Sequence, residues 1–271
     1  MRVDQIAGQR AADTPASVVL LHGIGGSARI WTPQLESLAT ANLRLAAIDL
    51  LGHGARPPVD KMDFNELAAD LEAAILRLEL ERPVLVGHSM GGMIAQTAVR
   101  RRPSGYRALV LCSTSPAFGD PNGEFQKRFV ADRLRPLDAG YTMREIASLS
   151  VDAAMGPHSD SSGRSLAIDI MASTPASTFR AAVHCLTGFD ERANLSNIKV
   201  PVLCLVGQQD ASAPAEMMRR MAAKIPTARY VCLPGVGHFP NLEAPQAFNA
   251  AVLDFLHAAL ASTGAESAHN E

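Results

Sequence analysis

One segment constrains the fold of this chain more than any other: residues 84–100, where a buried strand, a tight turn and a helix follow one another. Its first nine residues read Val-Leu-Val-Gly-His-Ser-Met-Gly-Gly. This order holds Ser89 on a strained elbow at the end of a strand, with its hydroxyl exposed above a sheet. Gly87 and Gly91 suit the elbow, because a Cβ at either position would clash with neighbouring backbone. The segment predicts an open α/β sheet with a candidate nucleophile at one strand end.

Short apolar runs alternate with helix-like stretches along most of the chain. Continuous apolar runs are typical of parallel strands covered by helices on both faces, and strands separated by helices predict βαβ units. The expected strands are 18–21, 45–48, 84–86, 108–112, 202–206 and 230–233. The expected helices are 31–39, 64–80, 90–100, 215–224 and 245–260. The predicted fold class is therefore α/β, with a mostly parallel central sheet flanked by helices.

The alternation stops between about residues 116 and 194, where helical fragments appear without a clear strand. A structureless loop of that length would be improbable in a compact domain. We therefore interpret the segment as a helical cap inserted into the core. The predicted division is 1–115 for the first part of the core, 116–194 for the cap and 195–271 for the second part of the core.

Composition and charge exclude several classes of function. The 271 residues are 47% hydrophobic, enough for a full core, and the net charge of −2 provides no field to hold nucleic acid or an anionic membrane. The N-terminus lacks the apolar region of a secretory signal, and no run of about 18 apolar residues is present to span a bilayer. We expect a soluble, cytoplasmic protein without nucleic-acid or membrane partners, whose oligomeric state the sequence leaves open.

The cysteines and histidines do not suggest a metal site. None of the four cysteines forms a Cys-x-x-Cys pair, which favours reduced core thiols over a disulfide framework. No cluster of His, Cys and Asp has the spacing of metal ligands. We expect neither a metal nor an organic cofactor.

An activated serine needs a base within hydrogen-bond reach and a third group that orients the base. His238 follows the last expected strand in the loop Pro-Gly-Val-Gly-His-Phe-Pro, and Asp210 follows the strand before it. Both therefore lie at carboxyl ends of strands, where ligands bind in open α/β sheets. The order Ser89, Asp210, His238 is the one expected for a serine on such an elbow. We predict that these three residues are catalytic.

The other histidines are weaker candidates for the base. His88 is adjacent to the serine, but its side chain is expected to point away. His257 falls in the final helix and His269 in the tail. His158 and His184 lie in the expected cap, where a packing or surface role is favoured.

The oxyanion formed when Ser89 attacks a carbonyl needs preorganised donors. The backbone N–H of Met90 is one expected donor. The glycine-rich loop His-Gly-Ile-Gly-Gly at 22–26 supplies the other, from Ile24.

Substrate-binding residues are harder to predict, because core packing or solvation explains most candidates equally well. The apolar candidates for a pocket are Trp31, Phe118, Met155, Phe179 and Phe239. The arginines that could pair with a substrate carboxylate are Arg56, Arg128, Arg133, Arg144, Arg164 and Arg180.

Together these motifs resemble the α/β-hydrolase family across essentially the whole chain. The matching pieces lie at 22–23, 49–54, 87–92, 207–210 and 237–238. The resemblance implies an eight-stranded sheet with a lid, and metal-independent hydrolysis through an acyl-enzyme. Family members usually open with a β-hairpin, whereas only about 17 residues precede Val18 here. The first strands are therefore expected to be short or partly missing.

Within the family, the chain looks like the 3-oxoadipate enol-lactonases and similar carboxylesterases. The segments that carry this likeness are 87–96, 171–175, 179–182, 189–195, 200–201 and 241–243. The nucleophile Ser89 excludes the dehalogenase and epoxide-hydrolase branches, which use aspartate there. Phe239 stands where the hydrolases of carbon–carbon bonds usually carry tryptophan, which argues against that branch.

We therefore predict a serine hydrolase that cleaves a small carboxylic ester or lactone, similar to 3-oxoadipate enol-lactone, in the catabolism of aromatic compounds. Three alternatives stay open. They are a carbon–carbon hydrolase of ring-cleavage products, a non-catalytic receptor or interaction module on the same scaffold, and a cofactor-free perhydrolase with the same triad.

Overall fold

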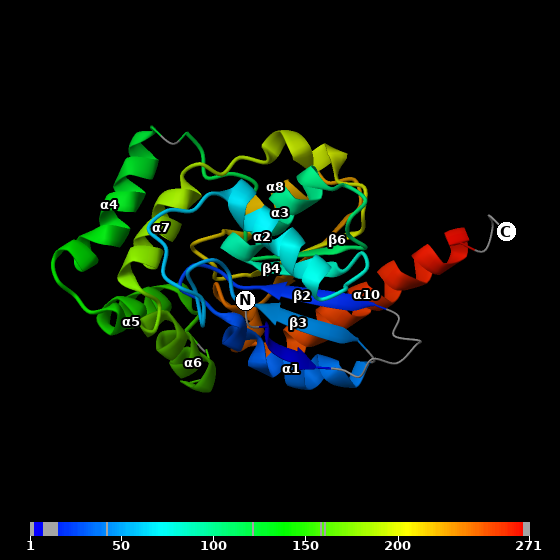
Figure 1. Ribbon diagram of the computed structural model, residues 1–271, viewed down its shortest axis with the longest axis horizontal. Coiled ribbons are helices and arrows are strands. Elements are labelled where there is room, and N and C mark those ends of the chain that lie inside the picture. The colour runs from blue at the N-terminus through cyan, green and yellow to red at the C-terminus, as the bar shows by residue number, and fades with distance from the viewer. Residues whose placement is uncertain are drawn as a thin grey trace.

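The computed structural model describes residues 3–7, 16–41, 43–120, 122–157, 159 and 161–267. In these residues the centre is a seven-stranded sheet in the order β1-β3-β2-β4-β5-β6-β7 (Figure 1). The strands are β1 (Val3–Ala7), β2 (Ser17–Leu21), β3 (Arg44–Ile48), β4 (Val84–His88), β5 (Leu109–Cys112), β6 (Val202–Gly207) and β7 (Ala228–Leu233). The predicted α/β architecture is confirmed, because the six strands β2 to β7 run parallel to one another.

The edge strand β1 is not among the strands that the apolar runs predicted, because its sequence Val-Asp-Gln-Ile-Ala contains no continuous apolar run. It pairs antiparallel with β3, and it is short, as the resemblance led us to expect for the first strands. The resemblance implied eight strands, and the described residues form seven. Residues 8–15, between β1 and β2, lie outside the described residues.

The longer helices outside the expected cap lie close to their predicted positions. They are α1 (Thr32–Leu38), α2 (Phe64–Arg77), α3 (Met90–Arg101), α8 (Ala215–Ala222) and α10 (Pro245–Ser267), with the short α9 (Pro240–Glu243) before the last. The N-terminus of α2 is capped, since the Asp63 carboxylate accepts hydrogen bonds from the N–H groups of Asn65 and Glu66. None of the described helices is both long and apolar enough to cross a lipid bilayer.

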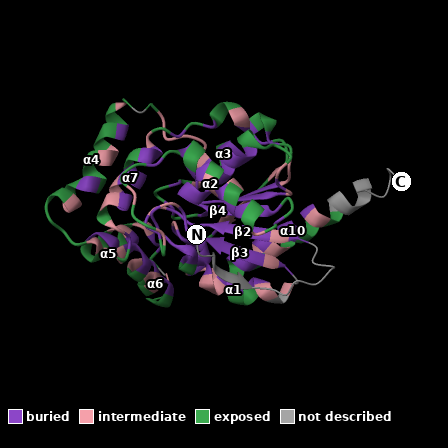
Figure 2. Cartoon of the chain, in the orientation of Figure 1, coloured by how far each residue is buried: buried purple, intermediate pink, exposed green. Residues whose placement is uncertain are grey.

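Each central strand is buried on both sides, which explains its uninterrupted apolar sequence. Val19 and Leu21 of β2 pack with α2, α3 and α8 on one face of the sheet, whereas Val18 and Leu20 pack with α1 and α10 on the other. Figure 2 shows the strands buried at the centre of the molecule. This alternation leaves the carboxyl ends of the strands as the place where polar side chains can gather.

The segment between β5 and β6 is helical, as the sequence predicts. It contains α4 (Glu124–Asp138), α5 (Met143–Ala154), α6 (Ser161–Ala172) and α7 (Ala176–Leu186), which lie beyond the strand ends on the left of Figure 1. The two ends of the segment meet at a β-bridge between Ala117 and Asp190. Beside it, the N–H of Phe118 donates to the carbonyl of Phe189 at 2.9 Å. The two ends of this helical segment therefore lie side by side.

Candidate active site

Ser89 occupies a strained turn between β4 and α3. Its φ of 52° and ψ of −119° place it where residues with a Cβ are rarely found. Two hydrogen bonds to the neighbouring strand and loop fix this backbone. The N–H of Ser89 donates to the carbonyl of Cys112 at 2.9 Å, and the Thr114 hydroxyl donates to the carbonyl of Ser89 at 2.7 Å. The turn therefore holds the serine in one position at the end of β4.

The glycines of the turn are required by close backbone contacts. A Cβ on Gly87 would lie 2.4 Å from the carbonyl oxygen of Gly91, and a Cβ on Gly91 would lie 2.3 Å from that of Leu21. Both distances are far below van der Waals contact, and backbone atoms cannot rotate away as a side chain can. The predicted crowding at the elbow is thus present, and part of it comes from the adjacent strand β2.

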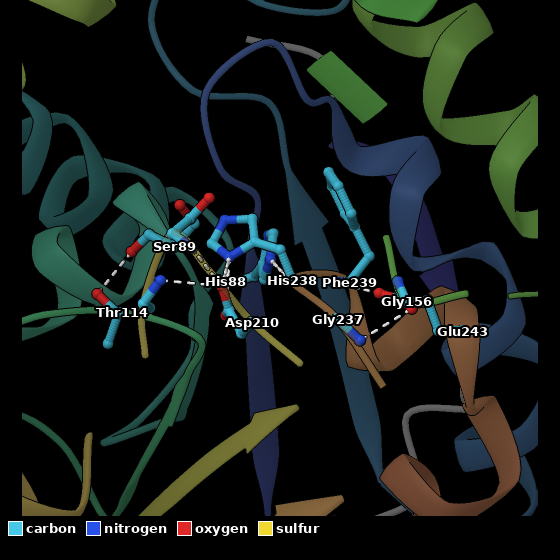
Figure 3. A network of polar contacts seen from close by, with 11 residues as sticks. His88, Ser89, Thr114, Gly156, Asp210, Gly237, His238, Phe239 and Glu243 are labelled. Atoms are coloured by element: carbon cyan, nitrogen blue, oxygen red, sulfur yellow. Dashed lines mark hydrogen bonds and ion pairs between the residues drawn. The ribbon is translucent and has the colours of Figure 1, made fainter. Parts of the chain in front are cut away.

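His238 and Asp210 meet beside the serine. His238 lies in the loop between β7 and α9, and its Nδ1 is 3.0 and 2.9 Å from the two carboxylate oxygens of Asp210. The carboxylate is held in turn by the N–H groups of Ser212 and Ala213, each 2.8 Å from Oδ1. The His238 ring lies between Ser89 and Asp210 in Figure 3, and Ser89 and His238 line the same cavity. The structure therefore brings together three residues that are far apart in the sequence.

The environment keeps Asp210 ionised. Burial raises the pKa of its carboxyl. The neighbouring His238 and the hydrogen bonds that the carboxylate accepts lower this pKa by more than burial raises it, so it lies below its ordinary value. An ionised carboxylate accepts a hydrogen bond from Nδ1–H and so favours the imidazole tautomer in which Nε2 can accept a proton.

A second histidine holds the backbone of the first. The Nε2 of His88 donates to the carbonyl of His238 at 2.6 Å, and the two ring centroids are 4.9 Å apart. Burial, followed by the charge of His238, lowers the pKa of His88 to about 3, so this ring is neutral. His88 was expected to point away from the serine. Instead it lines the same cavity and contacts the histidine loop.

The predicted oxyanion donors belong to two segments that flank Ser89. Ile24 lines the cavity, and a Cβ on the preceding Gly23 would lie 3.0 Å from the Cβ of Ser89. Met90 begins α3, and its side chain is fully buried. Its N–H lies in the first turn of the helix, where no intrahelical acceptor exists.

A cavity of about 420 Å³ lies between the strand ends and helices α4 to α7. This volume is within the range of small-molecule sites, which are mostly apolar with a few convergent polar groups. Three of the five predicted apolar candidates line it: Phe118, Phe179 and Phe239.

Trp31 and Met155 do not line the cavity, in contrast to the prediction. The Trp31 ring is fully buried and packs against Phe248 of α10, with centroids 6.1 Å apart. Met155 directly follows α5 and packs in the same hydrophobic cluster as Trp31. Both residues belong to the core, which was the alternative that the sequence left open.

Helix α4 contributes cavity residues that the sequence analysis did not single out as a group. Phe125, Phe129 and Arg133 all line the cavity, and their spacing of four residues places them on one helical face. The guanidinium carbon of Arg133 lies 5.2 Å from the ring centroid of Phe129. This repeated spacing is the signal in the sequence that could have identified them.

Arg133 is the only Lys, Arg, Asp or Glu among the described residues that lines the cavity. Within those residues its side chain has no carboxylate partner. Arg128 is exposed on the same helix. The other four arginine candidates form ion pairs with aspartates: Arg56 with Asp70, Arg144 with Asp169, Arg164 with Asp152 and Arg180 with Asp138.

The remaining histidine candidates are not near this site. His184 and His257 are exposed on α7 and α10, and neither lines the cavity. His158 and His269 lie outside the described residues. Across the described ranges, no three His, Cys, Asp or Glu side chains are grouped so that they could hold a metal ion.

The model of the alpha/beta hydrolase family matches residues 18–251, so the chain belongs to this family. The family and fold predicted from the motifs are thereby confirmed, and the protein is a hydrolase of the α/β type. One relative, a proposed carbamate hydrolase, RutD, of Pseudomonas syringae, is 30% identical over 254 residues, covering 90% of this chain and 95% of the relative. The pimeloyl-acyl-carrier-protein methyl ester esterase of Chromobacterium violaceum is 30% identical over 256 residues, covering 88% and 93%.

Solved structures share the fold over nearly the full length. The enol-lactonase from Burkholderia xenovorans LB400 superimposes with a TM-score of 0.82 at 24% identity, covering 93% of this chain and 95% of that one. At this identity the likeness establishes the fold alone. A thermophilic esterase from Thermogutta terrifontis, solved with malate bound, gives a TM-score of 0.79 at 26% identity, covering 94% and 98%.

Proposed function

We propose that this protein is a serine hydrolase that cleaves a small carboxylic ester or lactone through an acyl-enzyme. The observation that carries the proposal is the contact between His238 Nδ1 and Asp210, at 2.9 Å, next to Ser89 in the wall of a cavity. A serine becomes nucleophilic only when an oriented base can remove its proton, and this arrangement supplies both the base and the orienting carboxylate.

In the proposed mechanism, the Ser89 hydroxyl attacks the substrate carbonyl while His238 Nε2 accepts its proton. The N–H groups of Ile24 and Met90 stabilise the oxyanion that forms. The imidazolium then protonates the leaving alcohol, which remains attached to the acyl group when the substrate is a lactone. A water molecule, deprotonated by His238, hydrolyses the acyl-enzyme and regenerates Ser89.

The charge of Arg133 favours a substrate that carries a carboxylate. A guanidinium pairs with a carboxylate through two parallel hydrogen bonds, and the aromatic side chains of α4 provide apolar surface beside it. A 3-oxoadipate enol-lactone combines a cyclic ester for Ser89 with a free carboxylate for Arg133. We therefore propose an anionic lactone or ester of this kind as the substrate class.

We further propose that residues 116–194 form a cap on a core made of 1–115 and 195–271. Support comes from the Ala117–Asp190 bridge and from the position of α4 to α7 beyond the strand ends. Such a cap excludes water from the site, and this strengthens the electrostatic stabilisation of the oxyanion.

Replacing Arg133 with methionine is expected to raise KM for a carboxylate-bearing lactone by about 10- to 100-fold, because a hydrogen bond to a charged group contributes about 1.5–3 kcal/mol. The kcat should change less than KM, since the carboxylate takes no part in the bonds that are made or broken. Steady-state kinetics should show no comparable effect on a neutral methyl ester. Arg128→Met, on the same helix but outside the cavity, is the matched control. An equal loss on both substrates would refute the assignment.

The proposed function is tested by a panel of lactones, enol-lactones, short acyl esters and carbamates, assayed together with fluorophosphonate labelling. We expect hydrolysis of at least one anionic ester or lactone and a covalent adduct on Ser89. A folded protein that hydrolyses nothing and takes no label would instead support the non-catalytic receptor.

A further inference from the structure

The loop that carries His238 is held by three successive backbone N–H groups. The N–H of Gly237 donates to Glu243 Oε2 at 2.9 Å, and the N–H of Phe239 donates to Glu243 Oε1 at 2.8 Å. Between them, the N–H of His238 donates to the carbonyl of Ala154, at the end of α5, at 2.8 Å. One carboxylate therefore accepts hydrogen bonds from the residues on both sides of the histidine.

The same carboxylate reaches the connection between α5 and α6. Its Oε2 accepts hydrogen bonds from the N–H of Gly156 at 2.7 Å and from the hydroxyl of Ser159 at 2.6 Å. Figure 3 shows Glu243 with Gly156 and Gly237, on the side of His238 away from Ser89. Glu243 thus joins two segments that are about 80 residues apart in the sequence.

The two segments touch backbone to backbone at this junction, which leaves no room for a side chain on either glycine. A Cβ on Gly237 would lie 2.5 Å from the carbonyl oxygen of Ala154, and a Cβ on Gly156 would lie 2.5 Å from that of Gly235. The buried N–H groups at the junction need an acceptor, because leaving one unsatisfied costs about 1–3 kcal/mol. The partly buried Glu243 supplies both of its oxygens.

We infer that Glu243 is a positioning residue, which fixes the His238 loop to the α5–α6 connection and keeps the imidazole aligned between Asp210 and Ser89. The inference rests on the proposed function, since it assigns Glu243 a role through His238. The carboxylate touches neither Ser89 nor the cavity, so it acts on the rate through the geometry of the base and not through contact with substrate. The bonds from Glu243 to Gly156 and Ser159 also attach this part of the proposed cap to the His238 loop.

Glu243→Gln tests this role. Glutamine keeps the size of the side chain, but its NH₂ group replaces one of the two carboxylate oxygens. That oxygen accepts hydrogen bonds in the native protein, so in the variant a donor faces a donor and the bond is lost. Because a misplacement of about 1 Å can cost on the order of 100-fold in rate, we expect kcat to fall by about 10- to 100-fold. The rate of fluorophosphonate labelling of Ser89 should fall in parallel, while KM stays within about twofold of the native value.

Two readouts separate positioning from a purely structural role. The far-downfield proton NMR signal of His238 Nδ1–H should shift or broaden in Glu243→Gln, because it reports the hydrogen bond to Asp210. In the native protein, the amides of Gly237 and Phe239 should resist hydrogen exchange. Glu216→Gln, which alters an exposed carboxylate paired with Arg219 on α8, is the control and should change none of these values.

The inference is overturned if Glu243→Gln lowers the melting temperature but keeps the native kcat, labelling rate and NMR signal. If that variant does not fold, the role of Glu243 is tested by two other measurements: the kcat and labelling rate of Ser159→Ala, and the amide exchange of the native protein. A small parallel loss of kcat and labelling together with protected amides supports the role, and rapid exchange at both amides rejects it. If the native protein neither hydrolyses nor takes the label, the proposed function fails, while the NMR and exchange results still test Glu243.

Discussion

Replacing Ser89 with alanine is expected to lower kcat for an ester or lactone substrate by on the order of 10⁶-fold, the usual loss when a triad nucleophile is removed. Fold stability should change little. The contacts that fix the elbow use the backbone of Ser89, whose N–H bonds to Cys112 and whose carbonyl accepts from Thr114, and alanine keeps both. Substrate binding should persist, because the cavity and Arg133 are unchanged.

The measurement combines kcat on the best substrate of the panel with mass spectrometry of the fluorophosphonate adduct and a melting curve. Ser173→Ala is the matched control, because the Ser173 hydroxyl bonds to the carbonyl of Ile170 and does not line the cavity. Retention of substantial activity by a well-folded Ser89→Ala protein would remove the acyl-enzyme from the mechanism. Water activated directly by His238 would then be the nucleophile to test.

Asp210→Asn is expected to lower kcat by roughly 10⁴-fold. The amide can donate to Nδ1 of His238, which stabilises the tautomer with its proton on Nε2, and that nitrogen can then no longer accept the proton of Ser89. The fold should survive, since an amide oxygen can still accept from the N–H groups of Ser212 and Ala213.

The tautomer change can be observed directly by ¹⁵N NMR of the imidazole, alongside kcat. Asp190→Asn is the control, because this carboxylate is paired with Arg192 and does not line the cavity. A loss below about tenfold, with the proton still on Nδ1, would show that His238 does not depend on Asp210 for its orientation.

Much of the fold could be predicted because burial on both faces gives each central strand an uninterrupted apolar sequence. The edge strand β1 lacks this signal, since it pairs with β3 alone and carries polar residues at Asp4 and Gln5. Its pairing depends on a partner that is distant in sequence, and no local pattern encodes it.

The three candidate catalytic residues were predictable for a local reason: each lies in the turn or loop that follows a strand, and parallel strands present their carboxyl ends at one edge. The cavity walls were not predictable in this way. Trp31 and Phe129 are both aromatic residues of helical segments, yet one packs in the core and the other lines the cavity. The difference arises from how α4 to α7 dock on the sheet, which the local sequence does not specify. Glu243 belongs to a segment that carried the family likeness, but its bonds to Gly156 and Ser159 reach a distant part of the chain, which the local sequence does not encode.

The bridge between Ala117 and Asp190 has a consequence for how such a protein can diverge. Because the chain departs and returns at adjacent positions, the intervening helices can be lengthened, shortened or exchanged without altering the register of β5 against β6. A transplanted set of helices spliced at these two residues would also need to keep its contacts to the rest of the chain, among them the Gly156 N–H opposite Glu243 and the Ala154 carbonyl that accepts from the His238 N–H. If the proposed cap sets substrate preference, we expect that preference to be exchangeable with this segment while the candidate triad stays in place.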